Sequence, residues 1–223
     1  QSISALNLSN ASFASSGRTL GSVATSGLPV TFAASPSSVC TLPNETSTAL
    51  SYVHAGICTV TANQSGAGSR YSPAAEVSES FTVTADAPDA LTLLQLSPGA
   101  FKLDATWSLA TQLGGSTLTG YVISYAKDPS FSDENTLSST DTSTAITGLD
   151  ANTTYRVRVK VITSDYPDGS PWSNVLTAKT FGLPNAPVIT STSSPAPGSV
   201  TINWTDSTDS GGTSLLGYTV TAY

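Results

Sequence analysis

Apolar and polar residues alternate along most of this chain, with the period of two that is typical of β-strands. No stretch of ten or more residues places apolar side chains at the helical spacing i, i+3, i+4, i+7. Turn-forming pairs such as Gly114–Gly115 and Gly211–Gly212 separate the alternating segments. We therefore predict an all-β fold of tandem antiparallel β-sandwiches, without βαβ units. The clearest alternating segments are residues 81–84, 121–125, 155–161 and 200–204.

An internal repeat predicts how the chain is divided. Residues 107–121 align without gaps on residues 204–218, so that Trp, Gly-Gly, Leu and Gly-Tyr recur 97 positions later. A period of this length is that of one sandwich domain. An Ala-Pro pair precedes each copy, and the segments before these pairs, residues 84–86 and 180–185, are typical of short, stiff linkers.

Several spaced motifs lie between the two linkers. Trp107 precedes the first Gly-Gly turn, Leu149 stands six residues before Tyr155, and Ser-Pro-Trp-Ser occupies residues 170–173. On these motifs residues 87–181 resemble a fibronectin type III domain. The resemblance implies that Leu149 and Tyr155 form the family's tyrosine corner and that Ser170–Ser173 opens the last strand. Residues 184–223 resemble the first part of a second such domain, ending just after its C strand.

The N-terminal part of the chain carries different motifs. They are Gly-Leu-Pro-Val-Thr-Phe at 27–32, Ser-Val-Cys-Thr at 38–41, an alternating segment at 55–64 and Ser-Phe-Thr-Val at 80–83. On these blocks residues 1–86 resemble the bacterial Ig-like module that occurs in tandem in large surface and secreted proteins.

A sandwich that stopped after its C strand would leave one sheet face uncovered. Trp204, Ile202, Tyr218 and Val220 would then be exposed, and strand edges would be unpaired. Three explanations are open: the sequence is part of a longer chain, the last segment is disordered, or another chain supplies the missing strands by strand addition.

Two cysteines are present, and alternation predicts their environment. Cys58 shares a strand face with Val60 and Ala62, so we expect its side chain in the core, and we expect the same of Cys40. A disulfide between them would close a loop of 17 intervening residues and stabilise the fold by about 3 kcal/mol. Free buried thiols are the alternative. A catalytic thiol is disfavoured, because only His54 is nearby in sequence to act as a base.

Composition and charge exclude several classes of function. The 223 residues contain 15 acidic and 8 basic side chains, a net charge of −7, which disfavours nucleic acid and anionic membranes as partners. No apolar run is long enough to span a bilayer. A single histidine and two cysteines leave little for a metal site or a His-dependent triad. We expect no cofactor and no enzymatic activity.

A row of cations is the first candidate binding feature. Arg156, Arg158 and Lys160 alternate with valines, so all three stand on one face of a sheet. They would either form a docking stripe for an acidic polymer or pack against acids and aromatic rings of neighbouring strands. Trp172, expected on the adjacent strand, is a candidate cation–π partner and ligand contact.

The loop at residues 163–169 is the second candidate. It occupies the position where some fibronectin type III domains present an Arg-Gly-Asp tripeptide, which is absent here. Tyr166 in this loop is a candidate contact for a sugar or a protein, or else simply packs against the turn.

Acidic side chains gather in other loops, where they are typical of solvated turns rather than of catalytic pairs. Asp206 and Asp209 are candidate calcium ligands, because closely spaced oxygen ligands suit that ion. The aligned loop of the first copy has Gln112 and no acid, which argues against a calcium site common to both copies. The other candidate clusters are Asp128, Asp133 and Glu134 in one loop and Asp165 and Asp168 in another.

These expectations combine into one interpretation. The chain is expected to be a non-enzymatic, semi-rigid stalk or fibre segment of a multi-domain bacterial protein, extracellular or on the cell surface. Its partners would be neighbouring domains of the same or adjacent chains. The alternatives are a binding module for polysaccharide or a host surface protein, and an accessory segment of a secreted polysaccharide-degrading enzyme.

Overall fold

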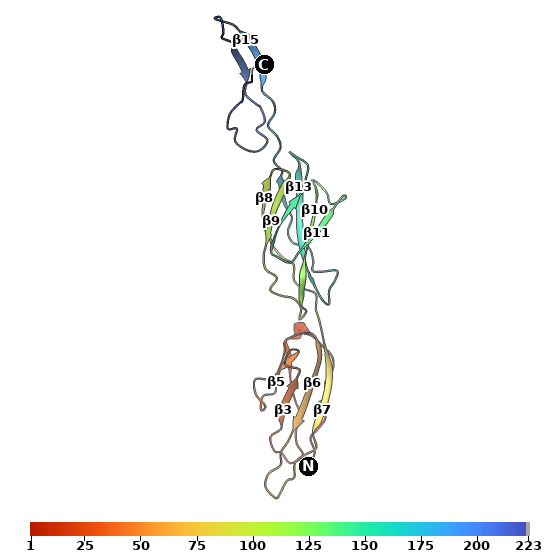
Figure 1. Ribbon diagram of the computed structural model, residues 1–223. Coiled ribbons are helices and arrows are strands. Elements are labelled where there is room, and N and C mark those ends of the chain that lie inside the picture. Colours follow the sequence, from red (N-terminus) through yellow and green to blue (C-terminus); the bar gives the residue numbers. More distant parts are fainter. Residues whose placement is uncertain (222–223) are drawn as a thin grey trace. The chain divides into compact units, whose positions relative to one another are not determined.

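The computed structural model describes residues 1–221 and is built almost entirely of β-strands (Figure 1). Within these residues the only helix is a three-residue 3-10 turn, η1 (Phe13–Ser15). The predicted all-β class is confirmed. The chain divides into two compact units. The first comprises residues 1–90, 110–119 and 161–171, and the second comprises 91–109, 120–160 and the chain from Trp172 onward.

Two sheets form the larger part of the first unit. One has the strand order β1-β7-β6-β3 and the other β2-β5-β4. All neighbours are antiparallel except β1 and β7, which run parallel from the pair Ala11–Val83. The strands are β1 (Ala11–Ser12), β2 (Gly17–Thr19), β3 (Thr31–Ser35), β4 (Cys40–Thr41), β5 (Ala49–Tyr52), β6 (Gly56–Asn63) and β7 (Val77–Thr84).

Alternation along β6 builds the core of the first unit. Cys58, Val60 and Ala62 are fully buried, as the sequence pattern predicts. Cys58 forms a disulfide with Cys40, which is equally buried, so the predicted pairing is confirmed. The bond joins β4 to β6 and therefore staples the two sheets together.

Seven further strands form a second pair of antiparallel sheets. Their orders are β12-β9-β8 and β11-β10-β13-β14. The strands are β8 (Leu93–Gly99), β9 (Lys102–Trp107), β10 (Leu118–Lys127), β11 (Asn135–Ser139), β12 (Ser143–Thr147), β13 (Thr154–Thr163) and β14 (Leu176–Lys179). Every second residue of β13 is buried, so the valines face the core and the cations face outward.

The predicted tyrosine corner is present in this pair of sheets. The Asp150 N–H donates a hydrogen bond of 3.0 Å to the Tyr155 hydroxyl oxygen, and Leu149 is buried beside it. Trp107 on β9 and Tyr121 on β10 meet edge to face in the core, with ring centroids 5.5 Å apart. The repeated Trp and Gly-Tyr motifs therefore mark core positions.

The expected start of the last strand is wrong. β14 begins at Leu176 rather than at Ser170, because at Ser170 and Ser173 the backbone N–H still donates to β13 but a side-chain hydroxyl, not the carbonyl, accepts the return hydrogen bond. Ser170 Oγ accepts from the Val161 N–H at 3.2 Å and Ser173 Oγ accepts from the Val159 N–H at 2.9 Å. Pro171 between them has no N–H to contribute to a ladder.

The C-terminal part of the second unit contains one strand pair, β15 (Val188–Ser193) with β16 (Thr201–Thr205). Trp204 and Tyr218 repeat the edge-to-face contact of the first copy, at 5.8 Å. The expected C strand is absent up to residue 221, since residues 214–221 have no strand partner. Of the four side chains expected on an uncovered face, Trp204 (37% exposed) and Val220 (56%) are exposed, whereas Ile202 and Tyr218 are half-buried. The last two residues of the predicted segment 184–223 lie outside the described part.

Candidate functional site

The outward face of β13 brings the three predicted cations together with aromatic rings. Arg158 lies between two rings, with its Cζ 4.1 Å from the centroid of Phe131 and 4.3 Å from that of Trp172. Lys160 Nζ is 4.8 Å from the Trp172 centroid, and Arg156 Cζ is 5.3 Å from that of Phe131. The structure thus shows the cation–π stacking that the sequence indicated for Trp172.

Two acids from the segment between β10 and β11 pair with these cations. Asp128 accepts a 2.8 Å contact from Arg156, and Glu134 accepts one of the same length from Arg158. Ser124 on β10, fully buried beneath the cluster, donates a 2.7 Å hydrogen bond to Glu134. This hydrogen bond, and after it the Arg158 guanidinium, hold the pKa of Glu134 below its ordinary value.

The row of cations is therefore part of a closed set of contacts, called here the aromatic–cation cluster: Asp128, Phe131, Glu134, Arg156, Arg158, Lys160 and Trp172. Sequence reasoning missed the role of Phe131, because its loop shows no periodicity that would place it over β13. The opposite charges of Asp128 and Glu134 were the available signal. The arrangement can hold the loop against the sheet.

The loop at residues 163–169 is also tied down, here within the first unit. The Tyr166 hydroxyl donates a 3.2 Å hydrogen bond to the Ala85 carbonyl, and its ring is half-buried. The Asp165 carboxylate accepts from the hydroxyls of Ser116 at 2.5 Å and Ser164 at 3.0 Å, and these two bonds lower its pKa. Tyr166 as a ligand contact stays a prediction, and in the structure its polar end is occupied by linker backbone.

The predicted calcium ligands lie in the turn before Gly211. Asp209 Oδ1 accepts a 2.8 Å hydrogen bond from the Gly211 N–H, so this carboxylate caps its own turn. Asp206 is exposed. Among residues 1–221 no group of three or more His, Cys, Asp or Glu side chains is arranged to hold a metal ion.

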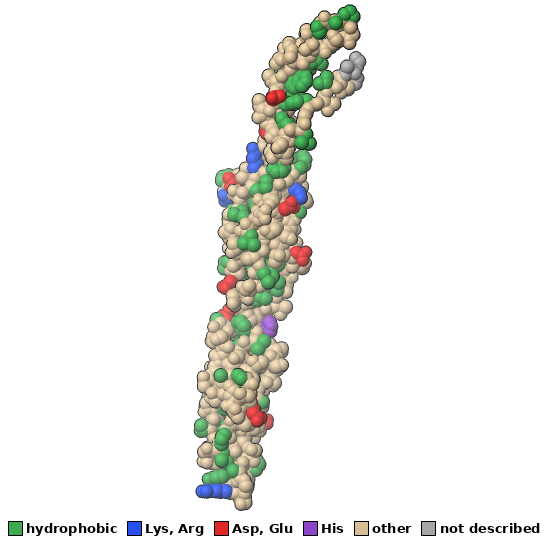
Figure 2. All heavy atoms as spheres, turned by 90° about the vertical axis from the view of Figure 1, so that its left-hand side faces the viewer, with side chains coloured by type: hydrophobic (Ala, Val, Ile, Leu, Met, Phe, Trp, Pro, Cys, Tyr) green, Lys and Arg blue, Asp and Glu red, His purple; other side chains and the backbone are tan. Residues whose placement is uncertain are grey.

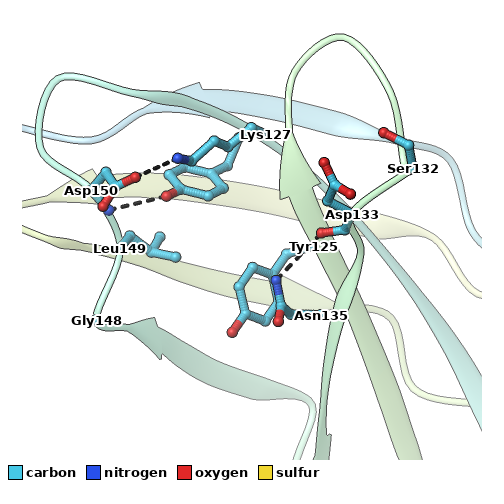
Figure 3. Close-up of a pocket in the computed structure, with 9 residues that line it drawn as sticks. Tyr125, Lys127, Ser132, Asp133, Asn135, Gly148, Leu149 and Asp150 are labelled. Carbon is cyan, nitrogen blue, oxygen red and sulfur yellow. Dashed lines mark hydrogen bonds and ion pairs between the residues drawn. The ribbon is translucent and has the colours of Figure 1, made fainter.

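A hollow of about 400 Å³ lies between the tyrosine corner and the start of β11 (Figure 3). At one side Lys127 pairs with Asp150 at 2.5 Å, and the hydrogen bond to Asp150 raises the pKa of Lys127. Asp133 and Asn135 stand on the opposite side of the Tyr125 ring (Figure 3). The volume would suit a small ligand. However, the charged side chains that line this hollow are exposed, and none of its lining residues forms a pair of nucleophile and base.

Charge is thinly spread over the surface. On the face drawn in Figure 2, acidic and basic side chains stand singly or in small groups, with no continuous area of one sign. Within the described part of the chain, no helix has the length and apolarity needed to cross a bilayer.

The sandwich with its tyrosine corner and inward-facing Trp belongs to a class of modules that occur in multi-domain proteins. Residues 86–179 match the family model of the fibronectin type III domain, and the chain therefore contains such a domain. Domains of this family serve as structural or binding modules in multi-domain proteins and are typically non-catalytic. The Ig-like resemblance of residues 1–86 and the second copy from residue 184 stay predictions.

Solved structures of fibronectin type III domains are similar to parts of this chain. A fourth FNIII domain from human is 22% identical. The match covers 45% of this chain and 84% of the human chain, with a TM-score of 0.40. The chicken CNTN1 FN1–FN3 structure is 14% identical. The match covers 81% of this chain and 67% of the CNTN1 chain, with a TM-score of 0.40. The FN5 domain of Drosophila Lar is 17% identical. The match covers 43% of this chain and 98% of the Lar domain, with a TM-score of 0.35. No curated protein sequence matches the chain significantly.

Proposed function

We propose that this chain is a non-enzymatic, semi-rigid stalk or fibre segment of a secreted or surface-anchored bacterial protein. Residues 1–86, 87–181 and 184–223 would be successive modules that hold another domain at a distance from the cell. The disulfide in the first unit suits an oxidising compartment, and domains of the fibronectin type III family are typically extracellular. The mechanism is steric and elastic.

One observation carries this proposal: the strongest candidate for ligand binding is satisfied by the chain itself. Arg158 already contacts two rings and one carboxylate, and Arg156 has its own acid. A docking stripe for an acidic polymer would leave its cations available, because each phosphate, sulfate or carboxylate needs a cation to pair with. The contacts instead stiffen one face of the sheet, which is what a module under mechanical tension requires.

The test is a binding screen on the full 223-residue chain, with acidic and neutral polysaccharides and with host surface proteins immobilised in turn. A stalk shows no saturable binding to any of them. Saturable binding that disappears in Arg158→Glu or Tyr166→Ala, but not in Lys179→Glu at an exposed position of β14, would replace the stalk with a binding module. Hydrolysis of a polysaccharide by the chain alone would overturn the non-enzymatic part.

A further inference from the structure

The two Gly-Gly turns of the repeat accept the same backbone hydrogen bond from the segment before their own copy, although the turns lie in different units. In the first unit, the Asp86 N–H donates to the Gly114 carbonyl at 2.9 Å. In the second unit, the Gly182 N–H donates to the Gly211 carbonyl at 2.8 Å. Both donors belong to the predicted linkers, so each turn receives the backbone of the linker that precedes its own copy.

A second hydrogen bond repeats beside the first. The Asp89 N–H donates to the Gln112 carbonyl at 3.1 Å, and the Asn185 N–H donates to the Asp209 carbonyl at 2.9 Å. The acceptors are 97 positions apart, as in the repeat, and the donors are 96 apart. The backbone thus has the same two-point attachment to the turn in both copies, although in the first copy the second donor, Asp89, lies just beyond the linker at 84–86.

An aromatic ring covers the second glycine of each turn. A Cβ on Gly115 would stand 2.5 Å from Cγ of Phe13, and one on Gly212 would stand 2.7 Å from Cδ1 of Phe181. Phe13 comes from η1, whereas Phe181 follows β14, so unrelated elements deliver the same ring to the same place. The Gly-Gly turn that receives the ring is therefore the same in both copies, whereas the element that carries the Phe differs.

Each Gly-Gly pair is required on two counts. All four glycines have positive φ, between 64° and 92°. In addition, a Cβ on Gly114 would overlap the Asp86 carbonyl, and one on Gly211 the Gly182 carbonyl. Close approach of another backbone is a common reason for glycine in a turn.

Further contacts hold the first attachment in place. The Gly115 carbonyl accepts from the Ala55 N–H at 2.8 Å and from His54 Nδ1 at 3.2 Å. The Asp86 carboxylate accepts from the Ser12 hydroxyl and from the Ala14 N–H, the latter at 2.7 Å, which ties the linker to the turn that carries Phe13.

We propose that the Gly-Gly turn of each fibronectin-type copy is a docking surface for the module before it. It binds the backbone at the linker through two carbonyl oxygens and one Phe ring through the open face of the second glycine. The partner is the preceding module of this same chain, residues 1–86 with Phe13 for the first turn and residues 87–181 with Phe181 for the second. This rests on the proposed stalk function, for which it supplies the joint.

The test is NMR spectroscopy of the full chain, because an aromatic ring above a glycine shifts that glycine's Hα resonances upfield. Upfield-shifted Hα resonances are expected for both Gly115 and Gly212. Phe13→Leu should abolish the shift at Gly115 and leave Gly212 unchanged, and Phe181→Leu should do the reverse. Each variant is therefore the control for the other. Unshifted resonances in the wild type, or equal effects of both variants on both glycines, would overturn the proposal.

A second comparison separates docking from backbone strain. Gly115→Ala and Gly148→Ala both place a side chain at positive φ, 79° and 72°, but a Cβ on Gly148 would meet nothing within 4 Å. Only Gly115→Ala should speed amide exchange at Ala55 and Asp86, by about tenfold, which corresponds to about 1.4 kcal/mol. Equal exchange in both variants contradicts docking. If the joint fails this test while the chain still binds nothing, the stalk proposal survives with a different joint.

Discussion

Replacement of Arg158 by Met gives the sharpest test of the aromatic–cation cluster. Methionine keeps an unbranched apolar stem of similar length but removes the guanidinium between Phe131 and Trp172. The Arg158 side chain is 22% exposed, so both stacking contacts are largely shielded from water. At about 0.5–1 kcal/mol for each ring, the two contacts predict a loss of about 1–2 kcal/mol of unfolding free energy. The ion pair with Glu134 adds little, because that carboxylate is 39% exposed.

The assay is native-state hydrogen exchange in the centre of β13, which reports the stability of this sandwich separately from the other modules. Lys179→Met is the matched control, since Lys179 is an exposed cation on the neighbouring β14. A double-mutant cycle of Arg158→Met with Trp172→Leu should show a coupling of about 0.5–1 kcal/mol. A change no larger than that of Lys179→Met, or a coupling of zero, would refute the idea that the stacked rings stabilise the loop.

Three further predictions concern other parts of the chain. Reduction of the disulfide, or Cys58→Ala with Cys40→Ala, should destabilise the first unit by about 3 kcal/mol for a loop of 18-residue separation, as measured by urea unfolding; no change would contradict the closed-loop argument. Tyr155→Phe removes the acceptor of the Asp150 N–H and should cost about 1 kcal/mol in thermal unfolding, whereas an unchanged melting temperature would show that the tyrosine corner is dispensable. The pKa of Glu134 is lower in the folded than in the unfolded chain, so its contribution is complete above its ordinary value of 4.5 and is lost as the pH falls through the folded pKa. Glu134→Gln should therefore flatten the acid side of the stability profile measured from pH 6 to pH 2, and an unaltered slope would contradict this assignment.

The strands and core could be read from the sequence because period-two alternation directly reports which side chains are buried. Cys58 occupies the core position that alternation predicted, and Tyr155 forms the corner that the resemblance to fibronectin type III domains implied. The start of β14 could not be read in this way. There the hydroxyls of Ser170 and Ser173 accept the β13 N–H groups in place of backbone carbonyls, and hydroxyl-rich sequence is common throughout this chain.

The candidate site was predicted only in part. The three cations follow from alternation on β13, and Trp172 stacks on them as predicted, although it precedes β14 instead of lying on the adjacent strand. Phe131 belongs to a loop whose path depends on tertiary contacts, so no local pattern indicates that it covers Arg158. The attachment of the linkers to the Gly-Gly turns was equally hidden, because turn chemistry alone explains a Gly-Gly pair.

The proposed stalk function requires successive modules to be held in a fixed arrangement, and pulsed electron spin resonance on the full chain tests this requirement most directly. Spin labels at Thr48→Cys and Ser138→Cys occupy exposed positions, and the native cysteines are fully buried in their disulfide. The stalk proposal predicts one narrow distribution of distances between the labels, unchanged in Gly148→Ala. A broad distribution, such as a flexible linker gives, would contradict it.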